Sequence, residues 1–159
     1  MFKTILVPLD GSEHSHRALE VAHRLASADD AVLYLLNVPE WPPAADLLGK
    51  SVGARAMGVS RQDVEQTGRQ LLEHFDEAEE SGHGMMEQMK KKLGASPVHT
   101  ESIVRVGSPA DIILEEAKRL GVDAIVMGSR GLSNLKELLV GSVSHKVLHA
   151  ARCTVVTVH

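Results

Sequence analysis

Apolar residues recur along this chain in two kinds of pattern. Short, mostly apolar runs lie at 4–9, 31–38, 123–127 and 153–158, and such runs are typical of parallel strands that are covered on both faces. The run at 98–106 alternates in part and predicts a strand at the edge of a sheet. The pattern therefore predicts strands that alternate with segments of a different periodicity.

Those intervening segments carry apolar residues at helical spacing. They predict helices over 13–27, 62–93 and 109–120, and a final helix that begins after Gly141. Ser12 is the expected N-cap of the first helix, because its hydroxyl can accept a hydrogen bond from a free amide of the first turn. Strands that alternate with helices predict an α/β fold, a parallel doubly wound sheet with right-handed crossovers.

The long helical segment contains an interruption, Gly82-His-Gly84, which predicts a break between two helices. The three methionines between residues 85 and 89 stand at helical spacing and are interpreted as core residues rather than as metal ligands. Before this segment, residues 39–68 read as a long loop in a single domain that spans 1–159. A loop of that length is a lid over a ligand or part of a partner surface, and the sequence leaves both open.

Composition and charge argue against several classes of partner. The net charge of −4 with no basic run argues against duplex nucleic acid as a partner, and 3% aromatic residues offer no stacking platform for single strands. No apolar run is long enough to span a membrane, and no signal peptide is recognised. The single cysteine, Cys153, cannot form an internal disulfide. A cytoplasmic protein is expected.

The most informative stretch follows the strand at 123–127. It reads Gly128-Ser-Arg-Gly131, then nine residues, then Gly141-Ser142. Gly128 can turn the backbone at the strand end, and Gly131 lets main chain approach a ligand closely. Gly141 opens a helix, whose free amides and dipole favour an anion. Hydroxyls of Ser142 and Ser144 add hydrogen-bond donors, so the stretch predicts a polyphosphate or nucleotide site.

The spacing Gly-x2-Gly-x9-Gly-Ser resembles the ATP-binding signature of the universal stress protein (UspA) family and its ATP-binding subgroup. The similarity extends to three further segments in the same order, at 5–12, 106–113 and 143–158. The resemblance implies a five-stranded sheet of order 3-2-1-4-5 with helices on both faces, a Rossmann-like fold related to the adenine nucleotide alpha hydrolases. In that order the first and fourth strands are neighbours, so Asp10 and Gly128 meet at the switch point where ligands bind.

The resemblance also implies a ligand, ATP, accompanied by Mg²⁺ or Mn²⁺ if a metal takes part. Main chain at the end of the second strand is expected to meet the adenine. The residues expected at the nucleotide are Pro8, Leu9, Asp10, Asn37, Val38, Met127, Gly128, Ser129, Arg130, Gly131, Gly141, Ser142, Val143 and Ser144.

Several of these residues have a second interpretation. Asp10 is either a turn residue that accepts nearby amide hydrogens, which the local sequence favours, or a ligand of the nucleoside, which the distal glycines and the family resemblance together favour. Arg130 is either a solvated surface residue or a phosphate ligand. His145 and His149 share a helix face at a spacing that zinc sites use, but no third ligand accompanies them, so a surface role is favoured.

The last strand, 153–158, would be a free edge, and the family pairs it with its copy in a second subunit, so a homodimer is expected. The main functional prediction is a dimeric cytoplasmic regulator of the stress response. In it, ATP orders the loop 129–140 and residues 39–68 and thereby changes the surface that a partner protein meets. Hydrolysis is expected to be slow at most, because the Walker lysine and a water-activating residue are missing.

Two alternatives remain. The first is a nucleotide-dependent enzyme on the same fold, an ATPase or a phosphoryl or adenylyl transferase. Adenylate-forming relatives carry Ser-Gly-Gly-x-Asp-Ser after the first strand, whereas this chain has Pro8-Leu-Asp-Gly-Ser12. The second is a dimerisation module without a ligand, which the intact glycine signature disfavours.

Overall fold

The computed structural model describes residues 1–40, 61–131 and 141–159. The described strands are β1 (Thr4–Leu9), β2 (Val32–Asn37), β3 (Thr100–Val104), β4 (Ala124–Gly128) and β5 (Thr154–Val158). The described helices are α1 (Glu13–Asp29), α3 (Arg61–Leu93), α4 (Pro109–Leu120) and α5 (Ser142–Ala150). The predictions for residues 41–60 and 132–140 fall outside the described residues.

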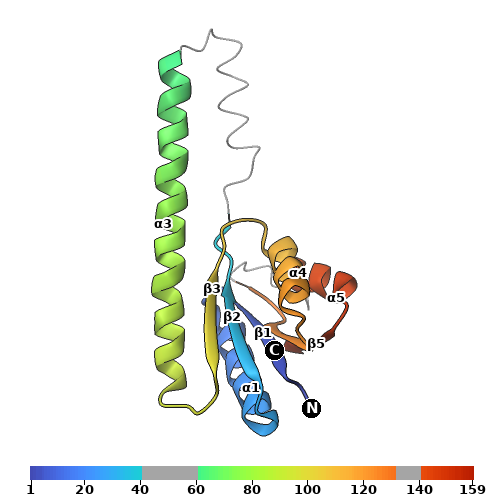
Figure 1. The fold of residues 1–159 in the computed structure, drawn as a ribbon. Helices are drawn as coiled ribbons and strands as arrows, with labels where there is room; N and C mark the ends of the chain where they lie inside the picture. The colour runs from blue at the N-terminus through green and yellow to red at the C-terminus, as the bar shows by residue number, and fades with distance from the viewer. Residues whose placement is uncertain (41–60, 132–140) are drawn as a thin grey trace.

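All five strands are parallel and lie in the order β3-β2-β1-β4-β5, which confirms the doubly wound sheet (Figure 1). β3 lies at one edge, as its partly alternating pattern predicted, and β5 lies at the other. The chain leaves β1 toward β2 and later returns to add β4 on the opposite side. The carboxyl ends of β1 and β4 therefore form the switch point.

Helices cover both faces of the sheet, and each face has its own core. On one face Ile5, Val7 and Leu9 of β1 pack with residues of α1 and α3. On the other face Leu6 packs with residues of α4 and α5. Because successive side chains of a strand point to opposite faces, a strand buried on both sides must be apolar at every position. This explains the unbroken apolar runs.

The first helix begins as predicted. Ser12 is its N-cap, and the Ser12 hydroxyl accepts a hydrogen bond from the amide of Ser15 at 3.1 Å. α1 continues two residues beyond the predicted end and stops at Asp30, whose φ of 53° lies in the left-handed region. None of the helices in the described ranges is both long and apolar enough to cross a membrane.

The predicted break at Gly82-His-Gly84 is wrong, because α3 is one continuous helix. Gly82 is buried where α3 meets the ends of β2 and β3. A Cβ at this position would lie 2.7 Å from both Asn37 Oδ1 and Val104 Cγ1. The glycine therefore permits close packing instead of ending the helix. Met86 and Met89, one and two turns further on, are buried in the core, as predicted.

The start of α3 at Arg61 also shortens the predicted loop. The sequence assigned residues 62–68 both to the end of the loop 39–68 and to the start of the helix 62–93, and the structure has them in the helix. From about Gly82 to its end, α3 lies along the β3 edge of the sheet, and its first half extends beyond the strands (Figure 1).

Candidate functional site

A cleft of about 380 Å³ lies at the carboxyl ends of β2, β1 and β4, at the predicted switch point. Residues from the strand ends and from the N-terminal parts of α4 and α5 surround it. Its lining comprises Pro8, Leu9, Asp10, Ser15, Leu36, Asn37, Val38, Pro39, Glu40, Pro109, Ile113, Met127, Gly128, Arg130, Gly131, Gly141, Ser142, Val143 and Ser144.

All of the predicted site residues except Ser129 line this one cleft. Ser129 is fully buried beside it. Its amide donates to the carbonyl of Val158 at 2.8 Å, and its carbonyl accepts from the amide of Gly141 at 2.7 Å. The Ser129 main chain thus joins the ends of β4 and β5 to the start of α5, and the structure gives Ser129 a supporting place behind the cleft wall.

On the β4 side of the cleft, the first amides of α5 have no hydrogen-bond acceptor among the described residues. The first intrahelical hydrogen bond of α5 runs from the His145 amide to the Gly141 carbonyl at 2.9 Å. The three preceding amides, at residues 142–144, have no intrahelical acceptor, and the N-cap Gly141 offers no side chain to cap them. These amides and the helix dipole make this side of the cleft suited to an anion.

Two of the predicted donors are already used within the protein. The Ser144 hydroxyl is buried and donates its hydrogen to the carbonyl of Gly128 at 2.8 Å, and the predicted contact of Ser144 with a ligand stays a prediction. The Gly141 amide is likewise occupied by Ser129. Both bonds fasten α5 to the end of β4. Ser142 is exposed at the cleft and keeps its hydroxyl available.

The glycines of the motif serve different purposes. A Cβ at Gly128 would lie 2.8 Å from the Cβ of His14 and 2.9 Å from its carbonyl carbon, so this position requires glycine because α1 packs against it. The φ of Gly128 is not positive, so a left-handed backbone is not the reason that this position needs glycine. A Cβ at Gly131 would lie 2.6 Å from Asp10 Oδ2. Main chain at Gly131 therefore approaches the carboxylate of β1 closely.

Asp10 combines its two predicted interpretations. One carboxylate oxygen, Oδ1, accepts from the amide of Ser12 at 3.0 Å, which is the turn interaction. The other oxygen, Oδ2, faces Gly131 across the switch point. One side chain thus fixes the turn after β1 and presents an acceptor to the cleft.

The β2 side of the cleft is mainly apolar, with Leu36, Val38, Pro109 and Ile113 among its lining residues. The carbonyls of Asn37 and Pro39 accept from Arg105 and Gly107 on the β3 side. Because main-chain groups of successive strand residues point to opposite neighbours, the carbonyl of Val38 points past the end of β1, toward the cleft.

The main chain of Asn37 does not take the direction that the sequence led us to expect. Its carbonyl is directed to the β3 side, where it accepts from Arg105 at 3.1 Å, so its main chain is not the one that faces the cleft. Its side-chain amide donates instead to the carbonyl of Leu9 at 2.8 Å. Asn37 links the ends of two strands beneath the cleft, a contact between positions that are far apart in sequence.

The charged groups at the cleft are the carboxylates of Asp10 and Glu40 and the guanidinium of Arg130. The buried Nε of Arg130 has no hydrogen-bond partner among the described residues, so it can donate to a ligand. Within the same residues no three His, Cys, Asp or Glu side chains form a metal-binding group. A divalent ion here would need oxygens from a ligand to complete its coordination.

Sequence reasoning missed several lining residues, which are Ser15, Leu36, Pro39, Glu40, Pro109 and Ile113. Two of them belong to the segment 106–113, which the sequence included in the family resemblance and at the start of a helix but did not assign to the ligand. Its helix, α4, packs over the ends of β1 and β2, and this packing places Pro109 and Ile113 at the cleft. No local signal in the sequence marks that arrangement.

The two histidines of α5 lie outside the cleft. The Nε2 atoms of His145 and His149 are 3.2 Å apart, and both residues are exposed. No third metal-binding side chain accompanies them in the part of the chain that the structure describes. The pair matches the surface interpretation.

Comparison with known proteins links the whole chain to one family. The family model described as "Universal stress protein family" matches residues 1–159. Universal stress protein YxiE of Bacillus subtilis is 37% identical over 99% of both chains. Universal stress protein A homolog 2 of Coxiella burnetii is 38% identical over 99% of this chain and 94% of its own.

Solved structures have the same fold. The structure of hypothetical protein MJ0577 matches with a TM-score of 0.79 at 28% identity and covers 99% of this chain and 96% of that chain. A universal stress protein solved in complex with cAMP matches with a TM-score of 0.57 at 25% identity, covering 99% and 97%. The second similarity shows that a chain of this fold can hold an adenine nucleotide.

Proposed function

This chain belongs to the universal stress protein family, and from that premise we propose that it is an ATP-binding, homodimeric regulator of the cytoplasmic stress response. One observation carries the proposal. A single cleft joins an apolar end at β2 to an amide-rich end at α5, with Asp10 between them. A nucleotide carries its groups in the same order as these parts of the cleft: an apolar base, a hydroxylated ribose and an anionic phosphate tail.

The strand spacing suits that ligand. The ends of β2, β1 and β4 are successive neighbours, so the cleft extends over two strand spacings, about 10 Å. In the proposed pose the base lies between the β2 end and Ile113, with the carbonyl of Val38 accepting from the adenine amino group. The ribose hydroxyls donate to Asp10 Oδ2. The phosphates meet Arg130 and the free amides at the start of α5.

A divalent ion fits this pose only together with the phosphates. The carboxylate of Asp10 approaches the glycine motif at Gly131, and Mg²⁺ is commonly bound by one or two carboxylates together with phosphate oxygens and water. The ion would neutralise the repulsion between the triphosphate and the carboxylates of Asp10 and Glu40. Binding of ATP is therefore expected to weaken when the ion is chelated, and binding of adenosine is not.

Regulation is favoured over rapid catalysis. The chain lacks the Walker pattern, since the position five residues before Gly49-Lys50-Ser51 is Ala44 rather than glycine. The bound nucleotide acts in this proposal as a signal that changes the surface met by a partner protein. The competing function is an enzyme that uses the same cleft for ATP hydrolysis or group transfer.

Calorimetric titration tests the proposal. ATP, ADP, AMP and adenosine are titrated into the wild type, with and without Mg²⁺, and into Gly131→Val and Gly84→Ala. Gly131→Val should weaken ATP binding at least about tenfold, because its side chain collides with Asp10 Oδ2 inside the cleft. Gly84→Ala is the control, since a Cβ there meets nothing within 4 Å.

Two results would overturn this function. If the wild type binds no adenine nucleotide, the chain is better explained as a dimerisation module without a ligand. If the purified protein hydrolyses ATP over several turnovers each minute, and Asp10→Ala abolishes this, the protein is an enzyme. Extraction of any nucleotide that co-purifies identifies the ligand independently.

A further inference from the structure

The contact between α3 and the end of β2 is unusually close. Gly82 is buried there, and a Cβ at this position would lie 2.7 Å from Asn37 Oδ1, 2.7 Å from Val104 Cγ1 and 3.2 Å from Pro39 Cγ. Real Cβ atoms essentially never approach other heavy atoms to below 3.0 Å. The helix therefore sits against these residues with no room for a methyl group.

Asn37 lies between this helix and the cleft. Its Oδ1 faces Gly82, while its Nδ2 donates to the carbonyl of Leu9 at 2.8 Å and lies 3.9 Å from the sulfur of Met85. The side chain is 6% exposed, so it has no alternative position in solvent. Its amide thus connects α3 to the last residue of β1.

The residues on either side of this connection line the cleft. Leu9 precedes Asp10, and Val38 directly follows Asn37. α3 also contacts the turn after β1. The sulfur of Met85 lies 3.4 Å from the position that a Cβ on Gly11 would take. A displacement of α3 at Gly82 must therefore move the ends of β1 and β2, which hold the β2 side of the cleft.

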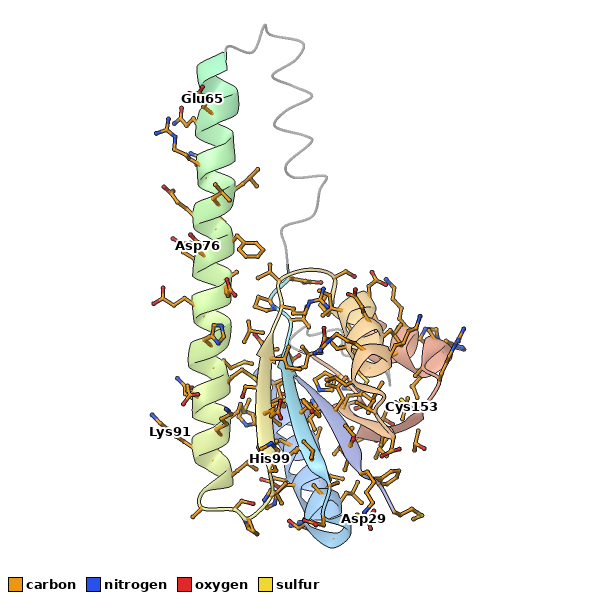
Figure 2. All side chains as sticks on the ribbon, viewed as in Figure 1. Asp29, Glu65, Asp76, Lys91, His99 and Cys153 are labelled. Carbon is orange, nitrogen blue, oxygen red and sulfur yellow. The ribbon has the colours of Figure 1, made fainter. Side chains whose placement is uncertain are left out.

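We propose that Asn37 is a positioning residue through which the placement of α3 sets the geometry of the base-binding end of the cleft. This inference rests on the proposed nucleotide site. It makes α3 an element that connects the cleft to the rest of the molecule, since the first half of α3, which carries Glu65 and Asp76, extends beyond the strands (Figures 1 and 2). Coupling of this kind is reciprocal, so an interaction that shifts α3 changes nucleotide affinity, and the nucleotide changes that interaction.

A matched pair of glycine substitutions tests the coupling. Gly82→Ala and Gly84→Ala add the same methyl group to the same helix, and both favour helix formation. Only the methyl at residue 82 meets Asn37 and Val104, whereas the one at residue 84 meets nothing within 4 Å. Gly82→Ala should weaken AMP, ADP and ATP binding by the same factor, about tenfold, and Gly84→Ala should leave all three unchanged. An equal loss for the three ligands localises the effect to the base end.

A double-mutant cycle tests the route through Asn37. In an Asn37→Ala background, where Oδ1 and Nδ2 are absent, Gly82→Ala should cause no further loss of affinity. Thermal unfolding of each variant, with circular dichroism at 25 °C, establishes that the variants are folded during the titrations. If Gly82→Ala does not fold, Asn37→Ala alone carries the test, with the same equal loss for AMP, ADP and ATP expected.

The outcomes separate the two proposals. If the wild type binds no adenine nucleotide, the proposed function fails. If it binds and Gly82→Ala binds as Gly84→Ala does, the nucleotide site stands and the coupling is wrong. If Gly82→Ala weakens binding equally in the wild-type and Asn37→Ala backgrounds, α3 acts on the cleft by another route and Asn37 is not the positioning residue.

Discussion

At the scale of single residues, the clearest unusual feature outside the cleft is the buried carboxylate of Glu116. It is 2% exposed and accepts from Arg105 Nη1 at 2.6 Å and from Arg119 Nε at 2.9 Å. Burial by itself raises the pKa of the Glu116 carboxyl, but the hydrogen bonds from Arg119 and Arg105 outweigh burial and lower this pKa below its usual range. The cluster ties α4, which bears Pro109 and Ile113, to the chain after β3.

We predict that Glu116→Gln lowers the free energy of unfolding at pH 7 by about 1–3 kcal/mol, because charge-assisted hydrogen bonds are lost in a buried place. The folded-state pKa is depressed, so this contribution is present above the pKa of the unfolded chain and is lost as pH falls through the folded pKa. Urea denaturation should therefore show a gap between wild type and variant at pH 7 that narrows below about pH 4.

Glu115→Gln supplies the control for this experiment. Glu115 also pairs with Arg105, at 3.0 Å, but its side chain is 62% exposed. Exposed pairs contribute little, so this variant should differ from wild type by less than about 0.5 kcal/mol. Equal effects of the two substitutions would show that burial of Glu116 is not the reason for its contribution.

At the scale of elements, α5 is a short helix whose start is left uncapped. It spans Ser142–Ala150, and its N-cap residue is Gly141, although Ser, Thr, Asn or Asp would cap it better. A side chain at this position would find space, since a Cβ would lie 3.4 Å from the Cα of Arg130, an ordinary contact. The absence of a capping side chain leaves the first amides of α5 available to a ligand.

We predict that Gly141→Asp and Gly141→Asn have similar unfolding free energies, because both residues cap helices well. Gly141→Asp should weaken ATP binding at least about tenfold more than Gly141→Asn, since its carboxylate repels the phosphates at the amides that both variants share. Calorimetry with ATP and adenosine measures this, with adenosine insensitive to the added charge. Identical ATP affinities in the two variants would place the phosphates away from α5.

At the scale of the whole molecule, β5 ends the sheet with one side unpaired in the described residues. The amide of Thr154 donates to the main-chain carbonyl of Asp123, the residue before β4. The carbonyl of Val158 accepts from the amide of Ser129, the residue after β4. Main-chain groups alternate in direction along a strand, so the amides of Val155 and Thr157 point away from β4. Such an edge is a template for a second chain, and it is where we propose that the homodimer forms.

We predict that Thr157→Pro converts the dimer to a monomer. Proline removes an outward amide and leaves the ladder between β4 and β5 unaltered, because that ladder uses residues 154, 156 and 158. Thr157→Val keeps the amide and should stay dimeric. Sedimentation equilibrium at micromolar concentration measures both, and a dimer that survives Thr157→Pro would place the interface elsewhere.

The sequence by itself determined the alternation of strands and helices and the place of the cleft at the switch point. Runs that are apolar at every position specify strands covered on both faces, and the helical spacing between them specifies the alternation, because both signals are local. The spacing of the glycines at 128, 131 and 141 predicted the amide-rich end of the cleft at α5. The resemblance of this spacing to a known family supplied the strand order. The place of Asp10 follows from that order, since it brings the ends of β1 and β4 together, whereas Val38 was implied by the family resemblance alone.

The tertiary structure alone decided how those residues divide their roles. Gly82 reads as a helix breaker and Gly128 as a turn, but each is a glycine because another element packs against it. Asn37 and Ser144 read as ligands, yet each bonds to a strand end. The partners involved, Val104 and His14 among them, are distant in sequence. Such contacts depend on how elements pack, and packing is absent from any local pattern.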